Sequence, residues 1–207
     1  MDPLRPTAPI RLDFAGPESR GVWLNPPPSH RSGGGLHLET GARTDFWQRT
    51  HYGFRHDDGH FWALLVAGDF TLEARARWTP RAQYDHCGLM VRAGPESWIK
   101  CSVEREDDRR SYLGSVVTNL GFSDWATQEV GAEVREMSYR VSRRDDDFLV
   151  ECASDGTDWH QLRVAHLHGC PEVLSAGVYA CSPVGERFAC TFEYLELRPC
   201  GWAVYAG

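Results

Sequence analysis

The chain has 207 residues, of which 42% are hydrophobic and 25% charged, a length and composition that suit one generous globular domain. Its 22 basic and 29 acidic residues give a net charge of -7, and no block of Lys and Arg could follow a phosphate backbone. No apolar run approaches the roughly 20 residues of a membrane-spanning helix. Nucleic acid and membranes are therefore not expected as partners.

The amino-terminal stretch MDPLRPTAPIRLDFAG has neither a positively charged leader nor a continuous apolar run, so it is not typical of a secretory signal. A cytoplasmic location is expected. The seven cysteines are an odd number without C-x-x-C spacing, and most lie in apolar strand-like runs. We interpret them as reduced core residues, in which the thiol acts as a small hydrophobe.

Two early segments do not follow a simple strand pattern. Residues 25–35, NPPPSHRSGGG, are rich in Pro and Gly and are expected to form a loop. Residues 44–62, TDFWQRTHYGFRHDDGHFW, mix six aromatic rings with titratable groups and lack a fixed period. The second segment is either a core strand entered through a loop or the lining of a site.

Alternation with a period of two dominates the rest of the chain. In residues 69–78 it places Phe70, Leu72, Ala74, Ala76 and Trp78 on one face. In residues 188–197 it places Phe188, Cys190, Phe192 and Tyr194 on one face. Turn residues separate about a dozen such runs, and no helix is indicated.

This pattern predicts an all-β fold in which two antiparallel sheets pack as a sandwich. We expect a single domain over residues 1–207, with a sandwich core at about 9–198 and a carboxy-terminal tail at 199–207.

Two successive strands carry polar groups on the face opposite their apolar one. In YDHCGLMVRA, Cys87, Leu89 and Val91 lie on one face of the strand, and the opposite face begins at His86. In ESWIKCSVERE, Ile99, Cys101 and Val103 alternate with Trp98, Lys100, Ser102 and Glu104. Such a face is either solvated or forms a concave surface that receives a ligand.

Six ordered motifs carry a resemblance to a known family. They are TDFWQRTHYG, GDF, YDHCGLMVRAGPESWIKCSVE, SVVTNLGFSDWAT, YRVSRR and GVYACSP. Between about residues 23 and 197 the chain resembles domain-of-unknown-function family 1349, whose members include regulation-of-enolase proteins. The resemblance implies a concanavalin A-like jelly roll with one concave face. It implies little about activity, because this fold hosts many functions.

His86 departs from the family pattern, which usually has Gln at this position. The imidazole is a candidate general base or metal ligand, or an incidental replacement of an amide in a polar groove.

With this fold, the concave face should bind a small polar ligand such as a carbohydrate. Aromatic planes would stack on apolar ring faces, while charged groups would fix hydroxyls. The expected ligand-contacting residues are Asp45, Trp47, His51, Tyr52, Asp85, Trp98, Ser102, Asp124, Trp125 and Arg163.

Glycoside hydrolysis requires two carboxyl groups at a defined separation. Glu104 and Glu106 are about 6.6 Å apart along a strand, but Glu106 opens a solvated acidic turn. A cross-strand partner for Glu104, such as Asp85 or Asp124, remains open. The indication of hydrolysis is weak.

Motifs for other chemistries are missing. The sequence has no Gly-x-Ser-x-Gly elbow, no Walker loop and no dinucleotide fingerprint. HLHGC at 166–170 and the trio His51, His56 and His60 lack the spacing of zinc sites. We therefore expect neither a cofactor nor a metal.

The favoured interpretation is lectin-like binding of a carbohydrate or other small polar ligand in the concave face. The first alternative is an enzyme, with Glu104 and His86 as acid and base and Lys100 or Arg163 holding an anion. The second is a regulatory module that binds another protein through the same face.

Overall fold

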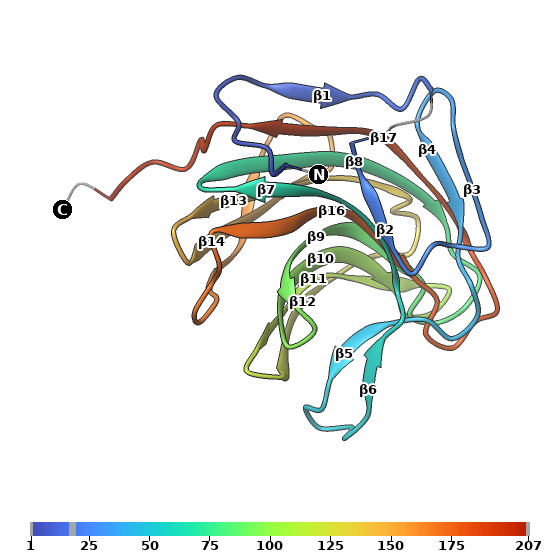
Figure 1. Cartoon of the computed structure of the whole chain (residues 1–207). Coiled ribbons are helices and arrows are strands. Elements are labelled where there is room, and N and C mark those ends of the chain that lie inside the picture. The colour runs from blue at the N-terminus through green and yellow to red at the C-terminus, as the bar shows by residue number, and fades with distance from the viewer. Residues whose placement is uncertain (1, 17–19, 206–207) are drawn as a thin grey trace.

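A computed structural model describes residues 2–16 and 20–205, and all regular elements in these ranges are strands. Two large antiparallel sheets lie face to face (Figure 1). The eight-stranded sheet runs in the order β15 (His160–His166), β14 (Asp147–Ala153), β13 (Glu136–Arg144), β8 (Phe70–Thr79), β17 (Ala189–Arg198), β4 (Leu36–Glu39) and β3 (Ser29–Ser32), with β1 (Ile10–Leu12) paired to β17.

The seven-stranded sheet forms the other layer. Its order is β12 (Phe122–Gly131), β11 (Arg110–Asn119), β10 (Ser97–Arg105), β9 (His86–Gly94), β16 (Val173–Cys181), β7 (His60–Ala67) and β2 (Val22–Leu24). A separate hairpin of β5 (Phe46–Gln48) and β6 (Arg55–Asp57) lies on the hollow side of this sheet (Figure 1). The expected jelly-roll sandwich is confirmed.

The main core lies between the two sheets and follows the predicted alternation. The apolar face of β8 is buried from Phe70 to Trp78, and Ile99, Cys101 and Val103 of β10 are fully buried opposite it. Five of the seven cysteines are also buried, in agreement with their interpretation as core residues. Strands β8 and β10 therefore turn the expected residues inward.

Two predictions about strands are corrected. Residues 25–35 are not all loop, because β3 forms within them and pairs with β4 at the edge of its sheet. Tyr194 does not share the buried face of Phe192, because a β-bulge at Glu193 shifts the register of β17. After the bulge Leu195 and Leu197 point inward, while the Tyr194 hydroxyl donates to Glu73 on the outer face.

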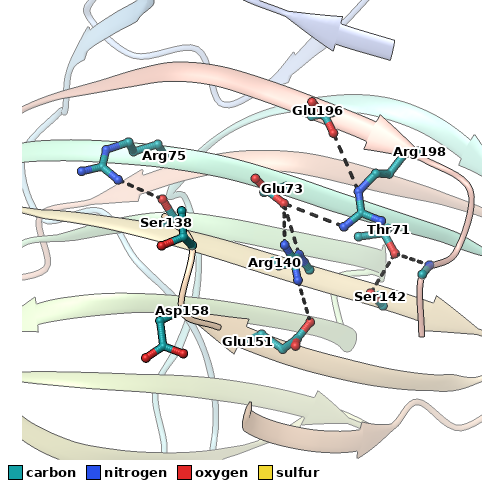
Figure 2. Close-up of polar contacts among 12 residues, drawn as sticks. Thr71, Glu73, Arg75, Ser138, Arg140, Ser142, Glu151, Asp158, Glu196 and Arg198 are labelled. Atoms are coloured by element: carbon teal, nitrogen blue, oxygen red, sulfur yellow. Dashed lines mark hydrogen bonds and ion pairs between the residues drawn. The ribbon is translucent and has the colours of Figure 1, made fainter. Parts of the chain in front are cut away.

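The outer face of the eight-stranded sheet is a network of paired charges (Figure 2). Glu73 of β8 accepts hydrogen bonds from Nε and Nη2 of Arg140 at 3.1 and 3.0 Å. The other guanidinium nitrogen of Arg140 lies 3.6 Å from Glu151. Charges on this face therefore satisfy one another within the sheet.

A second apolar cluster fills part of the hollow side of the seven-stranded sheet. Phe46 and Trp47 of the β5–β6 hairpin pack there against Met90, Trp98 and Tyr179. The hairpin thus covers a face that would otherwise be open to water.

The tail begins against the body of the fold. The backbone N–H of Gly201 donates to Thr71 at 2.9 Å, and Arg144 donates to the carbonyl of Trp202. Residues 206–207 of the expected tail lie outside the described residues. Within the described ranges, no helix has the length and hydropathy needed to cross a bilayer.

Candidate functional site

A pocket of about 280 Å³ opens on the hollow side of the seven-stranded sheet. The β5–β6 hairpin, strands β10 to β12 and two loops contribute to it. Its lining residues are Asp45, Trp47, Tyr52, Phe54, His56, Tyr84, Lys100, Glu104, Val116, Trp125, Pro183 and Val184.

Aromatic rings form the walls of the pocket. Tyr52 and Phe54, in the turn of the hairpin, stack with centroids 5.2 Å apart, and Trp47 meets Tyr52 edge-on at 5.6 Å. Trp125 of β12 contributes a further ring and is 37% exposed. These rings offer both flat faces and polar edges to a ligand.

The hairpin wall is fastened to the sheet by polar contacts. Arg92 of β9 forms a bidentate pair with Asp57 of β6 at 2.7 and 2.8 Å. The backbone N–H of Gln48 donates to Ser123 at 2.9 Å, and Arg49 donates to the carbonyl of Gly121 at 2.7 Å. The pocket is therefore largely preformed.

The floor of the pocket contains a buried ion pair next to the imidazole of His86. The ammonium of Lys100 lies 3.0 Å from Oδ1 of Asp45 and 3.2 Å from Nε2 of His86. Nδ1 of His86 lies 2.6 Å from the carbonyl of Tyr84, to which it must donate, so Nε2 accepts from the ammonium. Burial and the charge of Lys100 lower the pKa of His86 to about 4, so the ring is neutral.

Glu104 stands at the other side of the same imidazole. Its Oε2 lies 3.4 Å from Nδ1 of His86, and its side chain is only 16% exposed. Burial raises the pKa of Glu104 to about 8, although the charge of Lys100 opposes this shift. At neutral pH the carboxyl therefore carries its proton.

Asp45 has the opposite protonation state. Burial alone would raise its pKa, but the charge and hydrogen bond of Lys100 outweigh burial and lower it. The carboxylate is therefore ionised. The pocket thus holds one neutral and one ionised carboxyl group beside a neutral histidine.

Asp45, His86 and Cys181 offer ligand atoms within 4.8 Å of one another, which is compatible in distance with a metal ion. However, the Lys100 ammonium already contacts two of these residues and supplies the positive charge. Burial also raises the pKa of the Cys181 thiol well above its ordinary value, which disfavours the thiolate that a metal requires. The donor set fits an ammonium better than a metal.

The structure places six of the expected ligand contacts outside the pocket lining, among them Asp85, Asp124 and Arg163. Asp85 is fully buried, where it accepts from the backbone N–H groups of Arg81 and Ala82 and from the hydroxyl of Ser182. Asp124 pairs with Arg163 at 2.7 Å, and its register partner Val117 belongs to the main core. The side chain of Asp124 therefore lies on the opposite face of β12 from Trp125. These assignments are corrected: Asp85 fixes a loop, and Asp124 and Arg163 tie β12 to β15.

Trp98 is fully buried beneath the hairpin, so its assignment to the ligand surface is also corrected. Ser102 and His51 do not line the pocket either. Ser102 is 8% exposed in the floor, and His51 sits in the hairpin turn with its ring against Tyr52 at 4.8 Å. His86 is 1% exposed behind Lys100 and Glu104, so it can position these groups but does not line the pocket.

The structure brings Asp45, Trp47, Tyr52, Lys100, Glu104 and Trp125 together, all of which were expected at the site. Sequence reasoning missed others. Phe54 and His56 belong to the aromatic segment at residues 44–62, so the composition of this segment could have indicated that they line the pocket. Val116 faces Lys100 across β10 and β11, which only the register reveals. Pro183 and Val184 arrive from a distant loop without a local signal.

The chain matches the family described as "Protein of unknown function (DUF1349)" over residues 23–200. It belongs to this family. A protein of Saccharomyces cerevisiae (strain ATCC 204508 / S288c) described as "Regulation of enolase protein 1" is 35% identical over 189 residues, which are 90% of this chain and 94% of the yeast protein. A crystal structure of a functionally unknown S. cerevisiae protein has a TM-score of 0.75 and 33% identity, and covers 91% of this chain and 97% of its own.

The DUF1349 fold also resembles part of larger proteins described as GH43 proteins. The Bacteroides ovatus protein described as "Xyloglucan PUL GH43B" has a TM-score of 0.71 and 18% identity over 92% of this chain. The match covers 39% of the B. ovatus chain, as it does for a GH43 protein from Bacillus licheniformis with a TM-score of 0.70 and 14% identity. At these identities the likeness shows a shared β-sandwich fold alone.

Proposed function

We propose that this DUF1349 protein binds a carbohydrate, or another small polar ligand with an apolar face, in the pocket beside the β5–β6 hairpin. The observation that carries the proposal is the combination of aromatic walls with a buried polar floor. Cytoplasmic action is part of the proposal and is supported by the mainly buried, unpaired cysteines.

A sugar ring has apolar C–H faces and a rim of hydroxyl groups, and the pocket offers a partner to each. Trp47, Tyr52 and Trp125 provide rings against which a sugar face can stack. At the floor, Asp45 can accept a hydrogen bond from a hydroxyl, while Lys100 can donate one. The volume of about 280 Å³ lies near the lower end of small-molecule pockets, which suits one or two rings.

The charges of the pocket favour an uncharged ligand. The Asp45 carboxylate and the Lys100 ammonium neutralise each other at 3.0 Å, and Glu104 is protonated at neutral pH. Lys100 is the only Lys or Arg among the described lining residues. A carboxylate or phosphate on the ligand would therefore meet no uncompensated positive charge, so neutral sugars should bind better than uronates or sugar phosphates.

The proposal is tested by calorimetric titration with a panel of neutral mono- and disaccharides. Trp125→Ala removes a rim ring and should weaken binding about 10-fold or more, a loss of about 1.4 kcal/mol. The matched control is Trp159→Ala, which removes an indole that stacks on Arg140 of the eight-stranded sheet. No binding by any sugar, or equal losses in both variants, would contradict the proposal.

A further inference from the structure

We propose that the pocket hydrolyses a glycosidic bond with inversion, with Glu104 as proton donor to the leaving oxygen and Asp45 as base for the attacking water. The inference rests on the sugar binding proposed above and adds a chemical step to it. It is motivated by a feature that binding does not require, namely two carboxyl groups in one pocket with different partners and opposite charge states.

The two carboxyl groups flank a single imidazole. Nε2 of His86 lies 3.8 Å from Oδ1 of Asp45, and Nδ1 lies 3.4 Å from Oε2 of Glu104. Because the ring nitrogens are about 2 Å apart, the two oxygens are separated by at most about 9.5 Å. Inverting glycosidases hold their two carboxyl groups about 6.5–9.5 Å apart, and retaining enzymes about 5–5.5 Å. The pair is therefore close enough to act on one bond.

The Glu104 carboxyl is suited to donate a proton. It is mostly buried and lines the pocket, yet no group in the described ranges forms a hydrogen bond with it. Its carboxyl oxygens are therefore open to a group bound in the pocket. Its raised pKa, about 8, keeps the proton in place at neutral pH until a leaving oxygen can take it.

The Asp45 carboxylate is suited to accept a proton from water. Oδ1 is bonded by the Lys100 ammonium at 3.0 Å and the backbone N–H of Phe46 at 2.7 Å. Oδ2 accepts no hydrogen bond from residues 2–16 or 20–205 and is free to hold a water. Because Oδ1 is fixed to the sheet and to the hairpin, the carboxylate is poorly placed to move onto an anomeric carbon. Inversion through water therefore suits the pair better than a covalent intermediate.

The proposed step balances with water as the second reactant. The water oxygen forms a bond to the anomeric carbon while Asp45 takes one water proton. The bond between this carbon and the leaving oxygen breaks, and Glu104 gives its proton to the oxygen. The products are a free sugar of inverted configuration and an alcohol. Solvent returns a proton to Glu104 and removes one from Asp45.

The test begins with binding. Sugars that bind in the calorimetric panel are supplied as methyl, p-nitrophenyl and dinitrophenyl glycosides, and release of the sugar is followed by proton NMR. The parent protein should cleave at least one bound glycoside and release the inverted anomer first. Glu104→Gln should reduce cleavage of the methyl glycoside about 100-fold or more. It should largely spare the dinitrophenyl glycoside, whose leaving group needs no proton.

Two further variants separate chemistry from folding. Asp45→Asn should abolish cleavage of all glycosides, and its thermal melt shows whether the pocket survives. Glu106→Gln is the matched control for Glu104→Gln, because Glu106 follows β10 outside the pocket and its charge is the smallest influence on the pKa of Glu104, so cleavage should change far less than in Glu104→Gln.

The outcomes distinguish the two proposals. If no sugar binds, the proposed function fails and the hydrolysis fails with it. If sugars bind but no bound glycoside is cleaved, binding stands and the hydrolysis is overturned. Release of the retained anomer would also overturn the assigned roles. So would an equal loss of cleavage for all glycosides in Glu104→Gln.

Discussion

Two faces of the molecule carry alternating charged side chains, and they have different fates. On β8, Glu73 pairs with the guanidinium groups of Arg140 and Arg198 on the outer face of the eight-stranded sheet (Figure 2). On β10, Lys100 and Glu104 lie beneath the β5–β6 hairpin, which removes them from most of the solvent. The same pattern of alternation thus produces a paired surface in one sheet and a pocket floor in the other.

The difference comes from the cover and not from the strands. Phe46 and Trp47 of the hairpin exclude water from the floor. Burial there raises the pKa of Glu104, whereas the charge and hydrogen bond of Lys100 lower the pKa of Asp45 in spite of burial. The outer network has no hairpin above it, and its mostly buried carboxylates Glu73 and Glu151 each lie beside the guanidinium of Arg140. A polar strand face therefore becomes a candidate site only when another segment buries part of it.

The largest expected effect comes from removing the buried ammonium. Lys100→Met leaves the Asp45 carboxylate buried without its partner, and we expect a loss of about 3–5 kcal/mol in the free energy of unfolding. Arg140→Met, the matched change in the outer network, should cost less, about 1–2 kcal/mol, because Glu73 keeps the Tyr194 hydroxyl at 2.8 Å and Arg198 at 3.9 Å as partners. Chemical denaturation measures both variants. Similar losses of stability in the two variants would contradict the difference between the pocket floor and the outer network.

A second effect follows from the close approach of the strands in the floor. A Cβ on Gly88 of β9 would lie 1.9 Å from the carbonyl oxygen of Cys101 in β10. Gly88→Ala should therefore cost about 1–3 kcal/mol through overpacking. Gly94→Ala, at the end of the same strand, has open space around its Cβ and should change stability by less than about 1 kcal/mol. Thermal melts of both variants provide the comparison.

The pH dependence of stability should also separate the two faces. The folded-state pKa of Glu104 is raised to about 8 from an ordinary value of about 4.3, so the unfolded chain releases this proton first. The stability associated with the neutral carboxyl is complete below about pH 4.5 and is lost as the pH rises through about 8. Glu104→Gln should therefore reduce the decline of the free energy of unfolding between about pH 4.5 and pH 8. An unchanged decline in this variant would show that Glu104 is not its source.

The smallest effect is expected at the link between the sheet edges. Asp124 is 72% exposed where it pairs with Arg163. Asp124→Asn should change stability by less than about 1 kcal/mol and leave sugar affinity unaltered. A marked loss of sugar affinity in calorimetry would show that Asp124 and Arg163 belong to the site.

The sequence predicts the sandwich well, because alternation with a period of two indicates which side chains of β8, β9 and β10 face inward. It also locates most of the pocket, because the aromatic segment at 44–62 has no simple period. What it cannot predict depends on distant partners. Asp85 fixes a loop only because Ser182 meets it 97 positions later. Trp98 is buried only because the hairpin folds over it.

The central claim is that the cover of the hairpin holds Glu104 neutral beside an ionised Asp45. Carbon-detected NMR of the side-chain carboxyl groups, in protein labelled at Glu and Asp, follows each titration directly. We expect Glu104, assigned through Glu104→Gln, to titrate with a midpoint near pH 8 and Asp45 to titrate below its ordinary range. A Glu104 midpoint near the ordinary value of about 4.3 would contradict the account.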